Sequence, residues 1–352
     1  MMDDGCMIEE VLNQFNISAE SVEPLGNGLI NRTWKVCTQD KSFVLQRIND
    51  NVFHEPQHIA ENIRLIADYL HQHHPEYLFV TPHQKPNGED FVVTEEGFFR
   101  MFPFIPRSHT IDAVQTPQQA YEAAKQFGKF TRLLADFDAG KLKITIPDFH
   151  NLSLRYQQFL CALKNGNPER VQQSRELIRD INNHADIVQH FEQIEINLEF
   201  RLRVIHHDTK ISNVLFDENN KGICVIDLDT VMPGYFISDV GDMMRTYLSP
   251  ITEEETDFTK IEVRDEFYQA IVQGYFSEME DVLSQTEKQQ FFYAGKFMIY
   301  MQALRFLTDH LNNDVYYGAK YENHNFIRAQ NQSILLKRLI EKEKSLSGIL
   351  FK

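Results

Sequence analysis

The sequence has few cysteines, a deficit of basic residues and no long apolar run. Its four cysteines form no Cys-x-x-Cys pair and have no histidine at metal-ligand spacing, so neither a zinc site nor a disulfide framework is predicted. Lysine and arginine total 35 against 51 aspartates and glutamates, a formal net charge of −16. Nucleic acid and anionic membrane both need a basic face, so neither is an expected partner. No apolar run is long enough to span a bilayer.

The chain has ample length and apolar content for a folded protein. With 352 residues, of which 42% are hydrophobic, it can form two domains or lobes around a sizeable core. The first five residues are acidic and lack the basic and apolar regions of a signal peptide, so a cytoplasmic location is expected. The oligomeric state is left open.

The strongest pattern is the run 204–213, which reads Val-Ile-His-His-Asp-Thr-Lys-Ile-Ser-Asn. It fits the His-x-Asp-x-x-x-x-Asn pattern of kinase catalytic loops, which serve phosphoryl transfer. In that pattern Asp208 is the expected catalytic base, Lys210 a catalytic cation that offsets charge on the transferring group, and Asn213 a magnesium ligand. His206, which opens the pattern, is expected to brace the backbone.

A predicted β-hairpin follows this loop and returns the chain to it. Two apolar runs, 214–216 and 223–226, flank the polar turn 217–222. The hairpin would bring Asp227 beside Asn213, and Mg²⁺ prefers hard oxygen ligands of this kind. We therefore expect Asn213 and Asp227 to hold a magnesium ion, with the phosphates of ATP completing its shell.

The periodicity of apolar residues divides the chain into two parts. Strands are expected over 21–25, 33–37, 42–46, 91–94 and 98–102, with helices over 6–15 and 56–71. Beyond the proline-containing stretch the pattern is helical over 116–136, 151–163, 168–193, 236–247, 263–276, 286–311 and 323–345. We predict an α+β, two-lobed, protein-kinase-like fold. Its parts would be a small antiparallel-sheet N-terminal lobe for nucleotide (1–102), a hinge (103–106) and a mainly helical C-terminal lobe for catalysis and substrate (107–352). An ordinary linker is the alternative for the hinge.

Candidates for nucleotide binding lie in the first part. Gly26, Asn27 and Gly28 fall between the first two predicted strands, where glycines would let backbone N–H groups approach triphosphate oxygens. A plain hairpin turn fits the same spacing. Met101 and Phe102 precede the hinge, whose backbone groups would hydrogen-bond adenine in a kinase-like fold.

The chain lacks the lysine that kinases carry on the third strand to hold the α- and β-phosphates. The corresponding positions are Gln46 and Arg47. Strand alternation turns Gln46 toward the nucleotide and Arg47 away, unless a bulge re-aims it. Glu61 is the helix carboxylate expected by position. Three alternatives follow: Arg47 substitutes, Gln46 hydrogen-bonds the nucleotide, or the protein is a weakly binding pseudokinase. The intact set of base and metal ligands favours an active enzyme.

Six stretches of the chain resemble one family of small-molecule kinases. They are residues 26–33, 45–49, 207–217, 224–234, 239–245 and 303–309. They resemble the aminoglycoside phosphotransferase and choline kinase superfamily, and within it most closely the N-acetylhexosamine 1-kinases, which phosphorylate the anomeric hydroxyl of free N-acetylglucosamine or N-acetylgalactosamine. The resemblance implies an ATP- and Mg²⁺-dependent sugar 1-kinase. The alternatives are a kinase of another small hydroxyl compound (hexose, aminoglycoside or amino alcohol) and a nucleotide-binding pseudokinase that acts as a regulator.

The same resemblance suggests contacts to the sugar from Asp229, Arg245, Arg305 and Tyr316. In an extended chain Asp229 would point to the same side as Asp227, toward sugar hydroxyls or a second cation. Arg305 lies in an otherwise apolar helical stretch, where a charged group needs a partner. A surface ion pair one turn along the same helix is the alternative.

Overall fold

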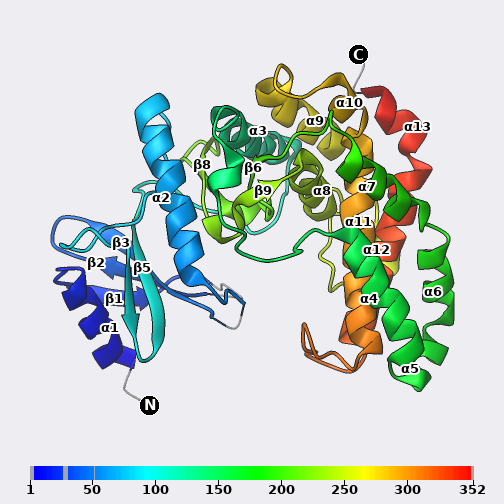
Figure 1. The fold of residues 1–352 in the computed structure, drawn as a ribbon, viewed down its shortest axis with the longest axis horizontal. Coiled ribbons are helices and arrows are strands. Elements are labelled where there is room, and N and C mark those ends of the chain that lie inside the picture. Colours follow the sequence, from blue (N-terminus) through cyan, green and yellow to red (C-terminus); the bar gives the residue numbers. More distant parts are fainter. Residues whose placement is uncertain (1–3, 27–30, 51, 350–352) are drawn as a thin grey trace.

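The computed structural model describes residues 4–26, 31–50 and 52–349 and shows two lobes (Figure 1). The small lobe contains a five-stranded antiparallel sheet in the order β1-β2-β3-β5-β4. Its strands are β1 (Ser21–Pro24), β2 (Arg32–Cys37), β3 (Ser42–Ile48), β4 (Phe91–Thr94) and β5 (Gly97–Pro103). The predicted fold class and the five predicted strands are confirmed.

The two faces of this sheet have different neighbours. Helix α1 (Asp4–Gln14) packs on one face and forms a separate apolar core with side chains that include Trp34, Leu45 and Met101. Because side chains alternate along a strand, Gln46 and Arg100 lie on the other face, where Arg100 reaches the large lobe. Helix α2 (Pro56–His73) connects β3 to the segment before β4 and buries its apolar side in the main core.

The large lobe is mostly helical. Its helices are α3 (Pro117–Leu133), α4 (Leu152–Asn165), α5 (Pro168–Gln173), α6 (Arg175–Asn182), α7 (Asp186–Ile196), α8 (Phe236–Tyr247), α9 (Asp265–Met279), α10 (Gln285–Gln289), α11 (Phe291–Leu311), α12 (His324–Glu341) and α13 (Glu343–Leu346). Two short strand pairs carry the catalytic segments: β6 (Arg203–Ile205) with β9 (Met232–Gly234), and β7 (Val214–Phe216) with β8 (Gly222–Val225). None of the helices in the described ranges combines the length and apolar character needed to cross a bilayer.

Three helices predicted as continuous are broken in the structure. The stretch 168–193 forms α5, α6 and α7, the stretch 286–311 forms α10 and α11, and the stretch 323–345 forms α12 and α13. The breaks lie at Ser174, between Asn182 and Asp186, at Gln290 and at Lys342. Apolar periodicity continued across these positions, so the pattern alone gave no sign of the breaks.

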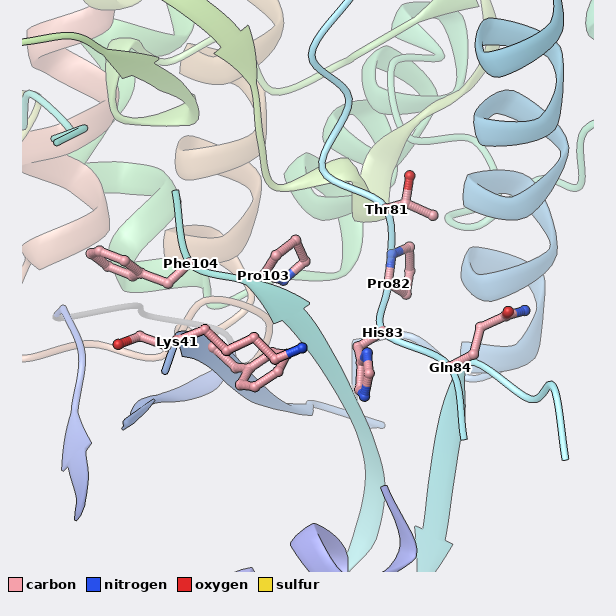
Figure 2. A pocket seen from close by; sticks show the side chains of 9 residues that line it. Lys41, Thr81, Pro82, His83, Gln84, Pro103 and Phe104 are labelled. Atoms are coloured by element: carbon pink, nitrogen blue, oxygen red, sulfur yellow. The ribbon is translucent and has the colours of Figure 1, made fainter. Parts of the chain in front are cut away.

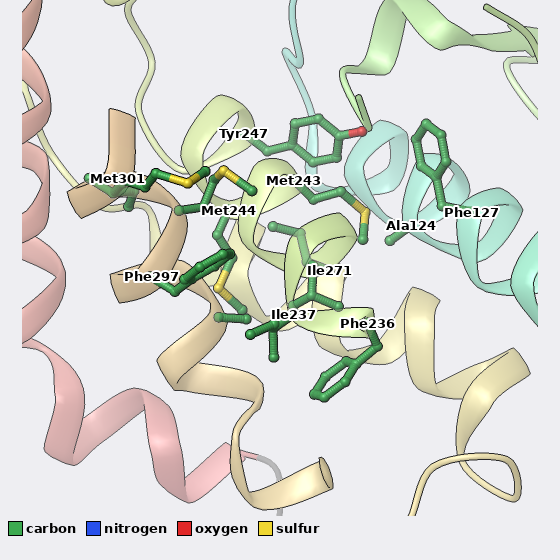
Figure 3. Packing of buried hydrophobic residues seen from close by; sticks show 14 of the residues in the cluster. Ala124, Phe127, Phe236, Ile237, Met243, Met244, Tyr247, Ile271, Phe297 and Met301 are labelled. Atoms are coloured by element: carbon green, nitrogen blue, oxygen red, sulfur yellow. The ribbon is translucent and has the colours of Figure 1, made fainter. Parts of the chain in front are cut away.

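Helix α8 is held tightly between α9 and α11, where Met243, Met244, Ile271 and Phe297 pack together (Figure 3). Its Gly241 lies directly against α11, and a Cβ at this position would be 2.3 Å from the carbonyl oxygen of Ala294. Cores at this packing density do not absorb such an overlap, so only glycine fits here. The helix that underlies the catalytic loop therefore has a fixed position.

A buried ion pair anchors the strand that leads into the catalytic loop. Arg203 of β6 faces Glu287 of α10 through two contacts, Nη1–Oε1 at 2.5 Å and Nη2–Oε2 at 2.8 Å. Glu287 also accepts the backbone N–H of Ser284 in a capping box. Removing one partner leaves the other charge buried and unpaired.

Replacing Glu287 with alanine is therefore expected to lower the free energy of unfolding by about 3–5 kcal/mol. Urea denaturation measures this loss. The matched control is Glu341→Ala, which removes the exposed partner of Arg338 and should change stability little. Equal effects of the two substitutions would contradict the anchoring role.

Candidate active site

The backbone of the catalytic loop is held from below by two carboxylates of α8. Asp239 accepts the backbone N–H groups of His206 at 3.0 Å and His207 at 2.7 Å, and Asp242 accepts that of Thr209 at 2.8 Å. His207 itself has a positive φ of 66°. Because α8 is fixed by its packing, these bonds fix the loop as well. The position of the loop therefore does not depend on contacts of the Asp208 side chain.

Asp208, Lys210 and Asn213 are brought together, as the loop pattern predicts. The amide nitrogen of Asn213 donates to the Asp208 carbonyl at 2.9 Å and to its carboxylate at 3.2 Å. Lys210 Nζ lies 3.1 Å from Asp208 Oδ1. Burial favours the neutral carboxyl, but the charges of Lys210 and His206 outweigh it, and the pKa of Asp208 lies below its ordinary value. Asp208 is therefore ionised at neutral pH and can accept a proton.

Asp227 stands in a left-handed backbone conformation with φ 61° and ψ 62°, which side chains with a Cβ rarely adopt. The residue before it is fixed on both sides. Ile226 donates its N–H to the Asn213 carbonyl at 2.9 Å, and its own carbonyl lies 2.9 Å from His206 Nε2. The hairpin thus returns to the loop as predicted, and His206 braces the backbone.

The carboxylate of Asp227 lies in a strongly anionic environment. Burial, together with the charges of Asp229 and Asp208, raises the pKa of Asp227 to about 7. A divalent cation would relieve this repulsion. The amide nitrogen of Asn213 is already used by Asp208, which leaves its amide oxygen as a ligand, so one carboxylate and one amide oxygen fit the small protein share of a magnesium shell. Within the described ranges, no three His, Cys, Asp or Glu side chains are grouped so that they could hold a metal by themselves.

A buried arginine occupies the region expected for the missing lysine. Arg100 of β5 donates from Nε at 3.0 Å and from Nη2 at 2.8 Å to Oε1 of Gln46. Its Nη1 lies 2.5 Å from Oδ1 of Asp229, whose other oxygen accepts from Asn31 at 2.7 Å. Asp229 is only 2% exposed. Both oxygens of the Asp229 carboxylate are therefore occupied by Arg100 and Asn31, so Asp229 is not free to contact a sugar as predicted. Gln46 accepts hydrogen bonds from Arg100, so it does not face a nucleotide by itself.

Two further candidates for the nucleotide side, Arg47 and Glu61, do not face the catalytic loop. As strand alternation predicts, Arg47 lies on the opposite face of the sheet from Gln46 and packs over Gly97, with Glu96 at 4.0 Å, so no bulge turns it toward the nucleotide. Glu61 is exposed on α2. The side chain of α2 that faces inward is its neighbour Asn62, which bonds the N–H and carbonyl of Lys143, each at 2.8 Å, and the carbonyl of Val231 at 3.1 Å. The helical period turns Glu61 outward and Asn62 inward.

The hinge end of the sheet also differs from expectation. The side chain of Met101 is buried in the core beneath α1, and its carbonyl accepts the N–H of His83 at 2.7 Å, so neither group is free for adenine. Phe102 is partly buried on the other face. A cavity of about 480 Å³ lies at this end, lined by the 81–84 segment, the start of β3 and Pro103 and Phe104 (Figure 2). Pro103 and Phe104 belong to the predicted hinge, whereas Met101 and Phe102 do not line the cavity.

The glycine turn between β1 and β2 is described only in part. Gly26 has a positive φ of 71°, and among the described residues no atom lies within 4 Å of the place where its Cβ would be, which suits a turn that glycine favours. Asn27 and Gly28, the other two predicted phosphate contacts of this turn, lie outside the described residues. Asn31, just beyond the turn, bonds Asp229 and accepts the N–H of Asn49 at 3.0 Å.

Arg305 of α11 is surrounded by aromatic rings. Its guanidinium lies 5.6, 5.8 and 5.4 Å from the ring centres of Phe149, Tyr316 and Tyr317, and its Nη2 is 3.4 Å from the Tyr316 hydroxyl. The ring of His150 stacks on Phe149. We call Phe149, His150, Arg305, Tyr316 and Tyr317 the aromatic–arginine cluster. The structure thus brings together Arg305 and Tyr316, two of the predicted sugar contacts.

His150 connects this cluster to the catalytic loop. Its ring centre is 5.2 Å from that of His207, the residue before Asp208. Burial, followed by the charges of His207 and Arg305, lowers the pKa of His150 well below its ordinary value, so the ring is neutral. No sequence motif pointed to His150. Side chains that can form hydrogen bonds thus continue from Asp208 through His207 and His150 to Arg305.

Arg245, the remaining predicted sugar contact, forms ion pairs within the protein. It pairs with Asp242 and with Glu253, each at 2.9 Å, and Glu253 in turn pairs with Arg328. Burial opposes the charge, but these carboxylates dominate and raise the pKa of Arg245 above its ordinary value. Arg245 therefore stabilises the Asp242 that supports the loop, and its guanidinium is not offered to an acceptor in this conformation.

Comparison with known proteins places these features in a family context. Residues 21–284 match the model of the phosphotransferase enzyme family (APH). Among solved structures, a microcompartment-associated aminopropanol kinase is 14% identical over 98% of this chain and 99% of its own, with a TM-score of 0.64. Spectinomycin phosphotransferase bound to ADP and spectinomycin is 13% identical over 95% and 97%, with a TM-score of 0.61. An ethanolamine kinase from Plasmodium vivax is 13% identical over 90% and 83%, with a TM-score of 0.56. At these identities the structural matches establish the fold.

Proposed function

Because the chain belongs to the phosphotransferase enzyme family, we propose that it is a small-molecule kinase that transfers the γ-phosphoryl group of ATP to the anomeric hydroxyl of an N-acetylhexosamine. The observation that carries the choice of acceptor is the aromatic–arginine cluster joined through His150 to the catalytic loop. Aromatic rings pack on the apolar faces of sugars, and an arginine donates to hydroxyl and acetamide oxygens.

The charges of this cluster argue against the cationic acceptors of the family. Aminoglycosides and amino alcohols carry ammonium groups, which need unpaired carboxylates nearby. Near the cluster, Glu253 is already paired with Arg245 and Arg328, and Asp309 accepts the backbone N–H groups of Tyr316 and Tyr317. Arg305 would repel a cation. A neutral acceptor rich in hydroxyl groups is the better match.

The proposed chemistry follows from the loop. Ionised Asp208 accepts the proton of the anomeric hydroxyl, which is more acidic than an ordinary alcohol and therefore asks less of the base. Lys210, 3.1 Å from Asp208, offsets negative charge as the phosphoryl group moves. A magnesium ion bound by Asn213 and Asp227 would supply charge neutralisation on the β- and γ-phosphates. The rigid loop places base and cation before the acceptor arrives, which lowers the entropic part of the barrier.

An acceptor panel tests this proposal. Purified protein with ATP and Mg²⁺ is assayed for ADP release with N-acetylglucosamine, N-acetylgalactosamine, glucose, an aminoglycoside and ethanolamine. We expect turnover with the N-acetylhexosamines and a product that has lost its reducing end. A product that keeps its reducing end would place the phosphate elsewhere. Preference for an amine would favour the amino alcohol or aminoglycoside alternative, and nucleotide binding without turnover would favour a pseudokinase.

Replacing Arg305 with alanine is expected to raise the KM for the sugar about 10-fold or more, because the sugar oxygen that Arg305 would bond is left without its hydrogen-bond donor. The KM for ATP should stay unchanged. Arg305→Lys should recover part of the loss. Arg132→Ala, which breaks the Arg132–Glu278 pair between α3 and α9, is the matched control and should change neither constant. An equal rise in both KM values would show that Arg305 acts through the fold.

A further inference from the structure

The missing lysine of the third strand leaves a question that the sheet register answers. Kinases of this fold hold the α- and β-phosphates with a lysine at the position occupied here by Gln46. In the antiparallel pairing of β3 with β5, Gln46 stands directly opposite Arg100. Cross-strand partners project from the same face of a sheet, with Cβ atoms about 5 Å apart. One of the two cross-strand neighbours of this position is therefore a cation, and the other is Thr33 of β2.

The donors of Arg100 are only partly used. An arginine has five N–H groups, of which two donate to Gln46, while Nη1 forms an ion pair with Asp229 at 2.5 Å without a hydrogen bond to it. Arg100 has no other hydrogen-bond partner among residues 4–26, 31–50 and 52–349, although it is only 4% exposed. At least two N–H groups of a buried guanidinium thus remain available. A planar guanidinium with two free donors matches the geometry of phosphate oxygens.

The surroundings of Arg100 make it a positioned cation. Gln46 accepts two of its N–H groups, and Asp229 neutralises it from the large lobe. In kinases the lysine is oriented by a carboxylate from the following helix, but here that helix turns Glu61 outward. An ion pair is present here too, but both partners come from other elements than in kinases: the cation is Arg100 of β5 and the carboxylate is Asp229 in the turn after Asp227.

Other cations of the small lobe are less suitable. Arg47 is on the opposite face of the sheet, where it packs over Gly97. Lys35 of β2 lies near the hinge end, with its Nζ 4.4 Å from the ring centre of Phe104. Among the described cations of the small lobe, Arg100 is the one that pairs with Asp229, two residues after Asp227.

We propose that Arg100 binds the α- and β-phosphate oxygens of the nucleotide in place of the missing lysine, with Gln46 and Asp229 as its positioning residues. This deepens the proposed function, since it assigns the nucleotide-phosphate contact of the same site. It also explains how a chain without that lysine can hold a nucleoside diphosphate or triphosphate.

The test compares the binding of ADP and adenosine, which differ only in the phosphates. Dissociation constants are measured by calorimetry, with Mg²⁺ and without acceptor, for the wild type and for Arg100→Gln. A phosphate contact predicts a loss of about 10- to 100-fold in ADP affinity, the range expected for hydrogen bonds to a charged group, with adenosine affinity unchanged. Arg64→Gln is the matched control, because Arg64 forms a comparable pair with Asp90 on the outer side of the same lobe.

A second variant keeps the test decisive if Arg100→Gln is unstable. The double variant Gln46→Lys, Arg100→Gln restores a lysine to the third strand, and we expect it to recover most of the preference for ADP over adenosine. If Arg100→Gln keeps the wild-type preference, or loses ADP and adenosine affinity equally without rescue by the lysine, the proposal is wrong. A wild type that binds no nucleotide would instead overturn the proposed function.

Discussion

Replacing Asp208 with asparagine is expected to lower kcat about 1,000-fold, within the range that general base catalysis contributes. Asparagine has nearly the same shape and can still contact Asn213, but it cannot accept the proton. The loop should stay in place, because its backbone is held by Asp239 and Asp242 and not by the Asp208 side chain. The KM for ATP should therefore change little.

Steady-state kinetics with the best acceptor of the panel measures this effect, and calorimetry with ADP checks that nucleotide binding survives. Asp217→Asn is the matched control: Asp217 accepts backbone N–H groups in the turn between β7 and β8, nine positions along the chain. It should retain nearly full activity. A kcat for Asp208→Asn within a factor of 10 of the wild type would remove Asp208 from the role of base.

Replacing Asp227 with asparagine is expected to abolish turnover and, at the same time, to stabilise the metal-free protein. The activity is lost because the carboxylate that would hold magnesium is gone. The stability is gained because the pKa of Asp227 in the folded state, about 7, lies far above its ordinary value of 3.8. A neutral amide removes the repulsion from Asp229 and Asp208 that burial makes severe.

The sign of the pH dependence follows from linkage. A carboxyl whose pKa is raised by folding adds to the free energy of unfolding when it is protonated. For Asp227 this contribution is complete below pH 4 and is lost as the pH rises through about 7. The stability advantage of Asp227→Asn should therefore be small at pH 4, grow between pH 4 and 7 and stay constant above. Urea unfolding in EDTA at pH 4.5, 6 and 8 measures it. If the stability gain of Asp227→Asn did not change with pH, the carboxyl of Asp227 would not have a raised pKa.

At pH 8, saturating Mg²⁺ with ADP should make the wild type more stable than Asp227→Asn, the reverse of the order expected without metal. A cation bound by Asp227 turns the repulsion into attraction, so the wild type gains stability on adding both ligands and Asp227→Asn gains less. Mg²⁺ with ADP is compared with ADP alone, which separates the metal from the nucleotide. Equal gains in the two proteins would place the metal elsewhere.

Local patterns were sufficient for the elements that carry the chemistry. The run 204–213, the hairpin that follows it and the five strands all depend on neighbours close in sequence, and the structure contains each of them. Lys210 and Asn213 contact Asp208 within the same loop, which the 3₁₀ turn over Ile211–Asn213 turns back on itself. Short-range geometry of this kind is what a sequence encodes most directly.

The partners of Asp229 and Gln46 required information that the local pattern does not contain. Predicting that Asp229 points with Asp227 assumed an extended chain, but Asp227 is left-handed and Leu228–Thr230 form a 3₁₀ turn, so alternation fails there. Arg100 and Gln46 are 54 positions apart and meet only through the register of β3 with β5. One signal was available: Arg100 is the single charged residue in the stretch 98–102, which is otherwise apolar.

The three hydrogen bonds of Asn62 have a consequence for regulation. In protein kinases, the helix that follows the third strand swings in and out to assemble or dismantle the catalytic ion pair. Here the corresponding helix α2 is bonded through a fully buried amide to the large lobe at Lys143 and Val231, and the carboxylate of the ion pair belongs to the large lobe already. Rotation of α2 would break all three hydrogen bonds of the buried Asn62 amide and would not move that carboxylate. Helix α2 is therefore braced against the large lobe, and its movement could not assemble or dismantle this ion pair as it does in a protein kinase.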